Sequence, residues 1–263
     1  MKIYLRLLRI FYTNALMSEF EYRLNFWSNI GMSFFWLIVS IFSINIFFLH
    51  TQTIAGWNYY NLLVVLGLFF AMNGYQQMVL QPNLSRLSEY VRLGTFDYVL
   101  TKPVNSQFFI SLRNIGINNV SDPLFGIGLI IYGLYQSHNT PNLLQVLFFI
   151  LLMISAMIIL YSLNLIIHIP TFWLVNLDQI DILTTRLLET ARFPLAFYQN
   201  PLLRNLLTFV IPVAFMTTFP AQALLGRSDW PVVLGAVLLA STLFTLSAAF
   251  WRFALIYYSG ASS

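Results

Sequence analysis

Residues 143–170 read LLQVLFFILLMISAMIILYSLNLIIHIP, a stretch that contains no Asp, Glu, Lys or Arg. An α-helix needs roughly 20 such residues to cross the hydrocarbon core of a bilayer. Only 8% of the 263 residues are charged, whereas soluble domains carry about 25%. The sequence therefore predicts an all-α integral membrane protein with six transmembrane helices. The other five predicted spans are 30–49, 60–79, 115–135, 203–216 and 231–257.

The basic residues lie almost entirely on one side of this six-helix model. The connections at 51–59 and 136–142 contain no Lys or Arg, and Arg227 is the one exception to the pattern. Because Lys and Arg accumulate in cytoplasmic loops, both chain ends are predicted in the cytoplasm. Topology thus explains the net charge of +4, and no nucleic-acid partner is expected. The residues on the predicted cytoplasmic side are Lys2, Arg6, Arg9, Arg23, Arg86, Arg92, Lys102, Arg113, Arg186, Arg192, Arg204 and Arg252.

Three cytoplasmic segments have helical patterns. Residues 1–27 begin with basic and apolar faces, which predicts an amphipathic helix in the membrane interface, or only a topology signal; we expect no removable signal peptide. Residues 171–192 predict a solvated helix with the side-chain pairs Asp178–Asp181 and Arg186–Glu189.

The third segment, residues 82–93, predicts an amphipathic helix that Pro82 opens and Gly94 ends. Its apolar residues recur at helical spacing and its charged residues fall on the other face. Such a helix can dock on a soluble partner; the alternative is that it lies on the membrane. The apolar face comprises Leu84, Leu87, Tyr90 and Val91, and the charged face comprises Arg86, Glu89 and Arg92.

Little in the sequence predicts catalysis. The chain has no cysteine, and its three histidines are far apart in the sequence, so no catalytic or metal-binding residues are predicted. His168 is expected to be a hydrogen-bonded residue near the membrane interface. Asp122 is the one acidic residue expected inside a span, and we predict a structural role, paired with Arg113, over proton transport. Neither lysine follows a glycine, so no phosphate-binding loop and no cofactor are expected in this chain.

Asn73, Gln76 and Gln77 form a polar patch on the second predicted span. Polar side chains in lipid need hydrogen-bonding partners. The patch could line a path through the membrane or hold helices together, and the sequence leaves both alternatives open.

Several short motifs, in this order and at these positions relative to the spans, resemble the membrane subunit of type-2 ATP-binding-cassette (ABC-2) exporters, within a bacterial permease group of about this length. They are EYRLNF at 21–26, GTFDYVLTKPV at 94–104, RFP at 192–194, IPVA at 211–214, and the tail motifs WR at 251–252 and YYSGA at 257–261.

The resemblance implies a permease in the bacterial cytoplasmic (inner) membrane. Its partners would be an ABC ATPase subunit that holds ATP and Mg²⁺, a second permease subunit, identical or homologous, and membrane lipid. Residues 82–93 would be the coupling helix, and 220–225 a short re-entrant helix before span six. The implied ATPase-coupling residues are Leu84, Arg86, Leu87, Glu89, Tyr90, Arg92, Gly94 and Asp97.

Spans one, two and five would lie nearest the translocation path of an amphipathic or lipid-like substrate. Its expected residues are Asn73, Gln76, Gln77, Phe209 and Phe215. Two other functions remain open. An ion-coupled secondary transporter predicts ionisable groups within the spans, and a membrane-embedded lipid-modifying enzyme predicts a catalytic cluster near one interface.

Overall fold

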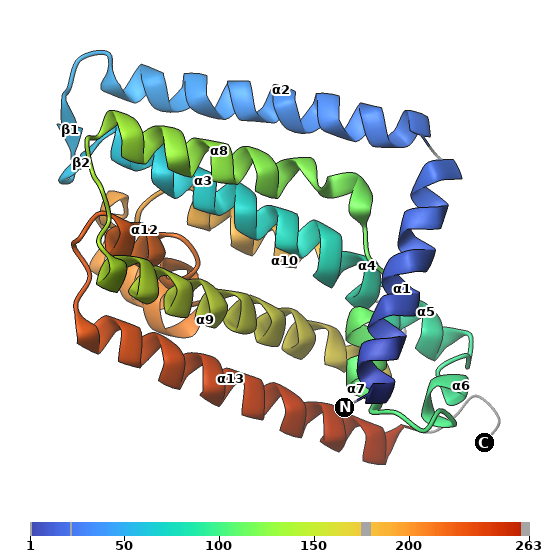
Figure 1. Ribbon diagram of the computed structural model, residues 1–263. Helices are drawn as coiled ribbons and strands as arrows, with labels where there is room; N and C mark the ends of the chain where they lie inside the picture. The colour runs from blue at the N-terminus through green and yellow to red at the C-terminus, as the bar shows by residue number, and fades with distance from the viewer. Residues whose placement is uncertain (1, 22, 175–179, 259–263) are drawn as a thin grey trace.

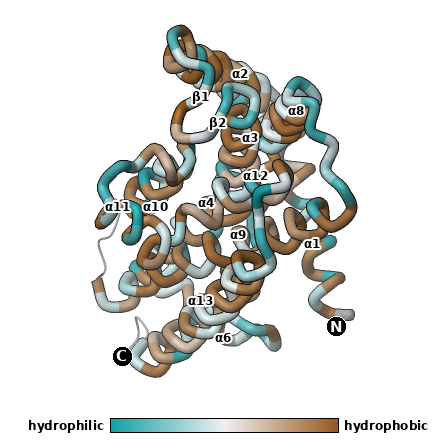
Figure 2. The backbone as a smooth tube through the Cα atoms, turned by 90° about the vertical axis from the view of Figure 1, so that its left-hand side faces the viewer, coloured by the Kyte–Doolittle hydropathy of each residue, from teal (hydrophilic) through white to brown (hydrophobic). Residues whose placement is uncertain are grey.

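The computed structural model describes residues 2–21, 23–174 and 180–258, and most of them are helical. Long helices lie side by side, and a small antiparallel pair of strands, β1 (Thr53–Ile54) and β2 (Trp57–Asn58), lies at one end (Figure 1). Figure 2 shows that the long helices are mainly hydrophobic and that hydrophilic residues gather in the connections. The architecture is that of a multi-pass membrane protein.

Among the described residues, four helices are long and apolar enough to cross a membrane, and two bent helix pairs bring the number to six if each pair is one span. Which of these helices cross the bilayer stays a prediction. The four are Leu24–Phe48, Tyr59–Arg92, Leu143–Phe172 and Trp230–Tyr257.

These four correspond to labelled elements as follows. The first lies in α2 (Arg23–Phe48). The second comprises α3 (Tyr59–Tyr75), the π-helical turn η1 (Gln76–Leu80), α4 (Gln81–Leu84) and α5 (Leu87–Arg92). The third comprises α9 (Leu143–His168) and η3 (Ile169–Phe172). The last is α13 (Trp230–Tyr257).

The predicted span 60–79 and the predicted coupling helix 82–93 are therefore parts of one helical run. Gly94 follows its last residue, Arg92, by two positions, with a φ of +68°. Its backbone N–H donates to Val91 O at 3.2 Å. A glycine just beyond a helix adopts this left-handed conformation without a Cβ clash. The predicted helix end is confirmed.

Helix α1 (Lys2–Glu21) stands at a steep angle to the long helices, across one end of them (Figure 1). Its Tyr4 and Phe11 pack edge-on against Phe108 and Phe109 of α7 (Ser106–Leu112). The predicted segment 1–27 is thus divided, because α1 ends at Glu21 and α2 begins at Arg23. Parts of the EYRLNF and YYSGA motifs, at residue 22 and residues 259–261, lie outside the described residues, as does Asp178.

The third predicted span, 115–135, is one arm of a bent pair. Helix α7 and the segment Ile117–Gln136 meet at 56°. That segment contains η2 (Ile117–Asn119) and α8 (Ser121–Gln136). Helix α8 packs very closely on α3: a Cβ added at Gly126 would lie 2.5 Å from Gly67 O. Small residues at a contact allow two membrane helices to approach this closely.

Residues 203–216, predicted as one span, do not form one straight helix. Residues Pro201–Val210 and Val213–Leu224 meet at 69°. Pro212 at the bend has no N–H to donate and restricts Ile211 to extended conformations, so a helix cannot continue through it. The segment contains α11 (Pro201–Asn205), the π turn η6 (Leu206–Val210), η7 (Val213–Phe215) and α12 (Thr218–Leu224).

The predicted re-entrant helix 220–225 corresponds to α12, which ends at Leu224. Leu224 O accepts a hydrogen bond from Asn139 Nδ2 at 3.3 Å. Arg227, three residues on, donates to Gly56 O beside the strand pair at 2.9 Å. Helix α12 therefore ends on the strand side of the molecule. The opposite end, where α1 begins and α13 ends, holds α5, α6 (Asp97–Leu100) and α7 (Figure 1).

The described part of segment 171–192 differs from the predicted solvated helix. Helix α10 (Ile180–Glu189) and the turn η4 (Thr190–Arg192) bury Leu188 and Ala191 in the main core cluster. Arg192 reaches Ser40, well inside α2. The segment packs among the long helices because it carries apolar residues on one face, a pattern that its average hydropathy conceals. The predicted Arg186–Glu189 pair is confirmed at 2.8 Å.

Candidate functional site

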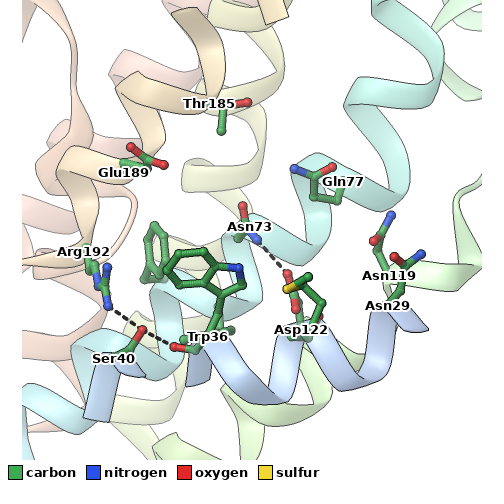
Figure 3. A pocket seen from close by; sticks show the side chains of 14 residues that line it. Asn29, Trp36, Ser40, Asn73, Gln77, Asn119, Asp122, Thr185, Glu189 and Arg192 are labelled. Carbon is green, nitrogen blue, oxygen red and sulfur yellow. Dashed lines mark hydrogen bonds between the residues drawn. The ribbon is translucent and has the colours of Figure 1, made fainter. Parts of the chain in front are cut away.

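A cavity of about 410 Å³ lies between α2, α3, the start of α8 and the α10–η4 segment (Figure 3). Polar and charged side chains from all four face an otherwise apolar wall. The size is within the range of pockets that hold small molecules. The lining residues are Asn29, Met32, Ser33, Trp36, Ser40, Phe69, Phe70, Asn73, Gln77, Asn119, Asp122, Thr185, Glu189 and Arg192.

Helix α2 contributes one polar stripe to this cavity. Asn29, Ser33, Trp36 and Ser40 follow one another at intervals of three or four residues, so they share one helix face. Ser40 Oγ donates to Trp36 O at 2.6 Å, which leaves its lone pairs free to accept a hydrogen bond from Arg192. Sequence analysis missed this stripe. The signal was present as helical spacing of polar residues in an apolar span.

Asp122 is the buried acid of the cavity. Only 7% of the residue is exposed, and its Oδ2 accepts a hydrogen bond from Asn73 Nδ2 at 2.6 Å. It lies in the first turn of α8, where the helix dipole favours a carboxylate. The predicted pairing with Arg113 is wrong, because Arg113 instead donates to Tyr90 Oη at 3.2 Å, near the C-terminal end of the Tyr59–Arg92 helical run.

Arg192 is the cation of the cavity, and it is the first residue of the RFP motif. Its guanidinium donates to Ser40 Oγ (Figure 3). Its Nε is buried and has no hydrogen-bond partner among the described residues. Glu189, one turn earlier, accepts from Arg186 instead. Arg192 was predicted to be cytoplasmic from the loop-charge pattern, but its contact with Ser40 sets it beside the middle part of α2.

The predicted path residues are only partly brought together. Asn73 and Gln77 line the cavity. Gln76 is buried and accepts from Asn164 Nδ2 of α9 at 3.5 Å, so the polar patch both lines a cavity and joins helices. Phe209 is 72% exposed and Phe215 is buried against Phe219; neither lines the cavity.

A second hollow, of about 500 Å³, lies at the end of the molecule where α1 begins and α13 ends (Figure 1), in the loop region between α5 and α7. We call it the basic cleft, because three cations and one carboxylate line it. Arg113 and Lys102 both lie over the Phe109 ring, at 5.3 and 5.2 Å from its centroid. The lining residues are Arg86, Glu89, Tyr90, Leu93, Thr95, Tyr98, Lys102 and Arg113.

The predicted coupling residues divide into a buried and an exposed group around this cleft. Leu84 and Leu87 are fully buried in the main core. Arg86, Glu89 and Arg92 are exposed, and the first two line the cleft with Tyr90. The chain therefore covers the apolar face of this helix with its own core. The surface left for a partner is the charged one.

Phe96, in the GTFDYVLTKPV loop, anchors this region. It is fully buried and packs edge-on against Phe172, Trp251 and Tyr258, at centroid distances of 5.2, 6.1 and 5.2 Å. Burial raises the pKa of the Tyr258 phenol, and the neighbouring carboxylate of Asp97 raises it further. Two separate motifs, around residues 96 and 258, thus meet in space. Sequence analysis did not predict this aromatic cluster.

His168 is hydrogen-bonded, as predicted. Its Nδ1 lies 2.7 Å from Asn164 O, and its Nε2 lies 3.1 Å from Asp181 Oδ1 of α10. Within the described residues, no three His, Cys, Asp or Glu side chains lie close enough to hold a metal ion. The His168–Asp181 pair therefore links α9 to α10 as a two-residue contact.

Two comparisons with known proteins bear on this site. A family model described as "ABC-2 family transporter protein" matches residues 34–262, which include most residues of the cavity and all those of the basic cleft. No curated protein gives a significant match to the chain.

Proposed function

Since the chain belongs to the ABC-2 family of transporter proteins, we propose that it is the membrane-spanning subunit of an ATP-driven exporter in a bacterial cytoplasmic membrane. A separate ATPase subunit would bind ATP and Mg²⁺ and would dock at the basic cleft. A second permease subunit, identical or homologous, would complete the translocation path. The exported substrate is amphipathic or lipid-like.

One observation carries this proposal: the cavity and the basic cleft share a single helical run. Asn73 and Gln77 line the cavity, while Arg86 and Glu89 line the cleft, and all four lie in Tyr59–Arg92. At 1.5 Å rise per residue, Gln77 and Arg86 are about 14 Å apart along the axis. A displacement of the cleft end therefore reaches the cavity directly.

The π-helical turn η1 (Gln76–Leu80) lies between the two sites. Such turns are rare and occur often at functional positions, since they perturb the regular hydrogen-bond ladder of a helix. In the proposed cycle, ATP-driven closure of the ATPase subunits pushes the α5 end. Helix η1 then transmits a tilt or a register change to Asn73 and Gln77, and thereby changes access to the cavity.

Charge supports the choice of docking surface. The cleft offers Arg86, Lys102 and Arg113 against one acid, Glu89. An acidic patch on the ATPase complements it, and complementary charges set orientation and association rate. Exposed Leu93 and Tyr98, 59% and 72% accessible, supply apolar contact area.

The test is co-purification of the full-length chain with its ATPase. The double variant Arg86→Glu/Lys102→Glu reverses the cleft charge. We expect it to lose most of the bound ATPase, while Arg252→Glu, an exposed cation outside the cleft, retains it. If the double variant recovers the full amount of ATPase with unchanged ATP turnover, the basic cleft is not the coupling surface.

A further inference from the structure

We infer that the cavity binds a zwitterionic headgroup, whose anionic group is held by Arg192 and whose cationic group is held by Asp122. The inference rests on the proposed function, because that function makes the cavity a substrate site. It names the chemical class of the substrate, which the family does not specify.

Arg192 has no direct ion-pair partner among the described residues. The described residues contain two ion pairs, His168–Asp181 and Arg186–Glu189, and neither includes Arg192. A guanidinium has five N–H donors, and here Ser40 accepts one while the buried Nε has no partner. A half-buried cation at membrane depth is costly unless it is paired. A phosphate or carboxylate entering the cavity would supply the missing acceptors.

Asp122 lines the same cavity and has spare capacity to accept hydrogen bonds. Its carboxylate offers about four lone-pair sites, and Asn73 uses one of them at 2.6 Å. The residue is 93% buried and belongs to neither ion pair. A primary ammonium group carries three donors, so it can satisfy the free carboxylate oxygen and leave donors for neighbouring carbonyl groups.

Charge balance selects a zwitterion over a simple anion. The charged lining residues are Asp122, Glu189 and Arg192. Glu189 forms an exposed ion pair with Arg186 at 2.8 Å and also interacts electrostatically with Arg192. Arg192 and Asp122 are the two charged lining residues that belong to neither ion pair of the described residues. An anionic ligand would leave Asp122 unmatched in a medium of low dielectric constant, whereas a zwitterion pairs both groups.

The cavity wall between the two charges fits such a ligand. Trp36 lies between Arg192 and Asp122 in Figure 3, and Met32, Phe69 and Phe70 complete the apolar part. The indole face attracts an ammonium group, and the apolar side chains suit the glycerol or acyl portion of an amphiphile. A volume of about 410 Å³ holds a headgroup but not two acyl chains.

Equilibrium binding to the purified full-length chain in detergent tests this. The probes are phosphatidylethanolamine, phosphatidylglycerol, and the soluble compound glycerophosphoethanolamine as competitor. We expect phosphatidylethanolamine to bind about tenfold more tightly than phosphatidylglycerol. Arg192→Gln should weaken phosphatidylethanolamine binding about tenfold, and Asp122→Asn should abolish the preference between the two lipids. Arg204→Gln, an exposed cation outside the cavity, should change nothing.

If glycerophosphoethanolamine displaces phosphatidylethanolamine, the headgroup alone is sufficient for binding. If it does not compete while the lipid still binds, the ligand is a whole lipid. Equal binding of the two lipids, tighter binding of phosphatidylglycerol, or binding unaffected by Arg192→Gln would overturn the inference. The binding assay uses the purified chain without an ATPase, so its outcome is independent of the co-purification test. If the chain does not bind the headgroup but still co-purifies with its ATPase, only this inference is refuted. If the chain binds the headgroup but the cleft variant keeps its ATPase, only the proposed coupling surface is refuted.

Discussion

Asn73 Nδ2 donates a hydrogen bond of 2.6 Å to Asp122 Oδ2, and this bond joins α3 to α8 inside the cavity. Both residues come from stretches that hydropathy predicts as membrane spans. Each would be costly alone in lipid, since a polar group there needs a partner. Because each residue satisfies the other, the pair allows α3 and α8 to pack together beside a polar cavity.

The pair predicts a non-additive effect on stability. Asn73→Leu leaves the Asp122 carboxylate buried without its donor and should cost about 1–3 kcal/mol, whereas Asn73→Leu/Asp122→Leu should recover much of the loss. Thermal unfolding of the purified chain in detergent measures this. A single variant as stable as the wild type would contradict the assignment of this bond.

The contact between α3 and α8 predicts a difference between two glycines two positions apart. Gly126→Ala places a methyl group 2.5 Å from Gly67 O, while a Cβ at Gly128 meets nothing within 4 Å. Overpacking should destabilise Gly126→Ala by about 1–3 kcal/mol, whereas Gly128→Ala should gain about 0.5–1 kcal/mol from helix propensity. Equal unfolding midpoints for the two variants would count against the close packing.

Phe96→Ala should loosen the loop at residues 93–105. The side chain is fully buried against Phe172, Trp251 and Tyr258, and truncating a buried phenylalanine costs about 3–5 kcal/mol. We expect faster proteolysis between residues 93 and 105, together with a lower unfolding midpoint. Tyr98→Ala, at an exposed position in the same loop, is the control. Identical protease sensitivity of the two variants would contradict the anchoring role.

The link between α9 and α10 predicts coupling between His168 and Asp181. Both neighbours of the imidazole, Asn164 O and Asp181 Oδ1, are acceptors. A double-mutant cycle of His168→Leu and Asp181→Leu should give about 1 kcal/mol of interaction energy. Strict additivity would mean that the two helices are held by other contacts.

The periodicity of apolar residues was sufficient to predict which side chains are buried where a helix has a single buried face. The spacing of Leu84 and Leu87 predicted that they share an apolar face, and both are fully buried, while Arg86 and Glu89 are exposed. Gly94 marked the end of this helix because glycine, which lacks a Cβ, adopts the left-handed conformation there without a steric clash. Such local rules need only the residues within one or two turns.

Hydropathy did not predict the position of polar residues that pack against another part of the same chain. Arg192 belongs to a segment with several charges, so averaging assigns it to a loop, although Ser40 of α2 accepts its hydrogen bond. Ser40 lies in α2, whose average hydropathy is strongly apolar, so the average does not reveal this polar residue. The two positions are far apart in the sequence, and only the tertiary fold brings them together. For the same reason, the frequency of phenylalanine could not identify which aromatic residues line the cavity.

ATP-dependent movement of phosphatidylethanolamine that carries only an isotopic label, with its headgroup amine unmodified, in proteoliposomes tests the central claim most directly. The account predicts transport only when the permease chain, its ATPase, ATP and Mg²⁺ are all present, with loss of transport in the cleft variant Arg86→Glu/Lys102→Glu. Transport at the same rate by the permease alone, driven by an imposed proton gradient and abolished by Asp122→Asn, would contradict it and would identify an ion-coupled transporter instead.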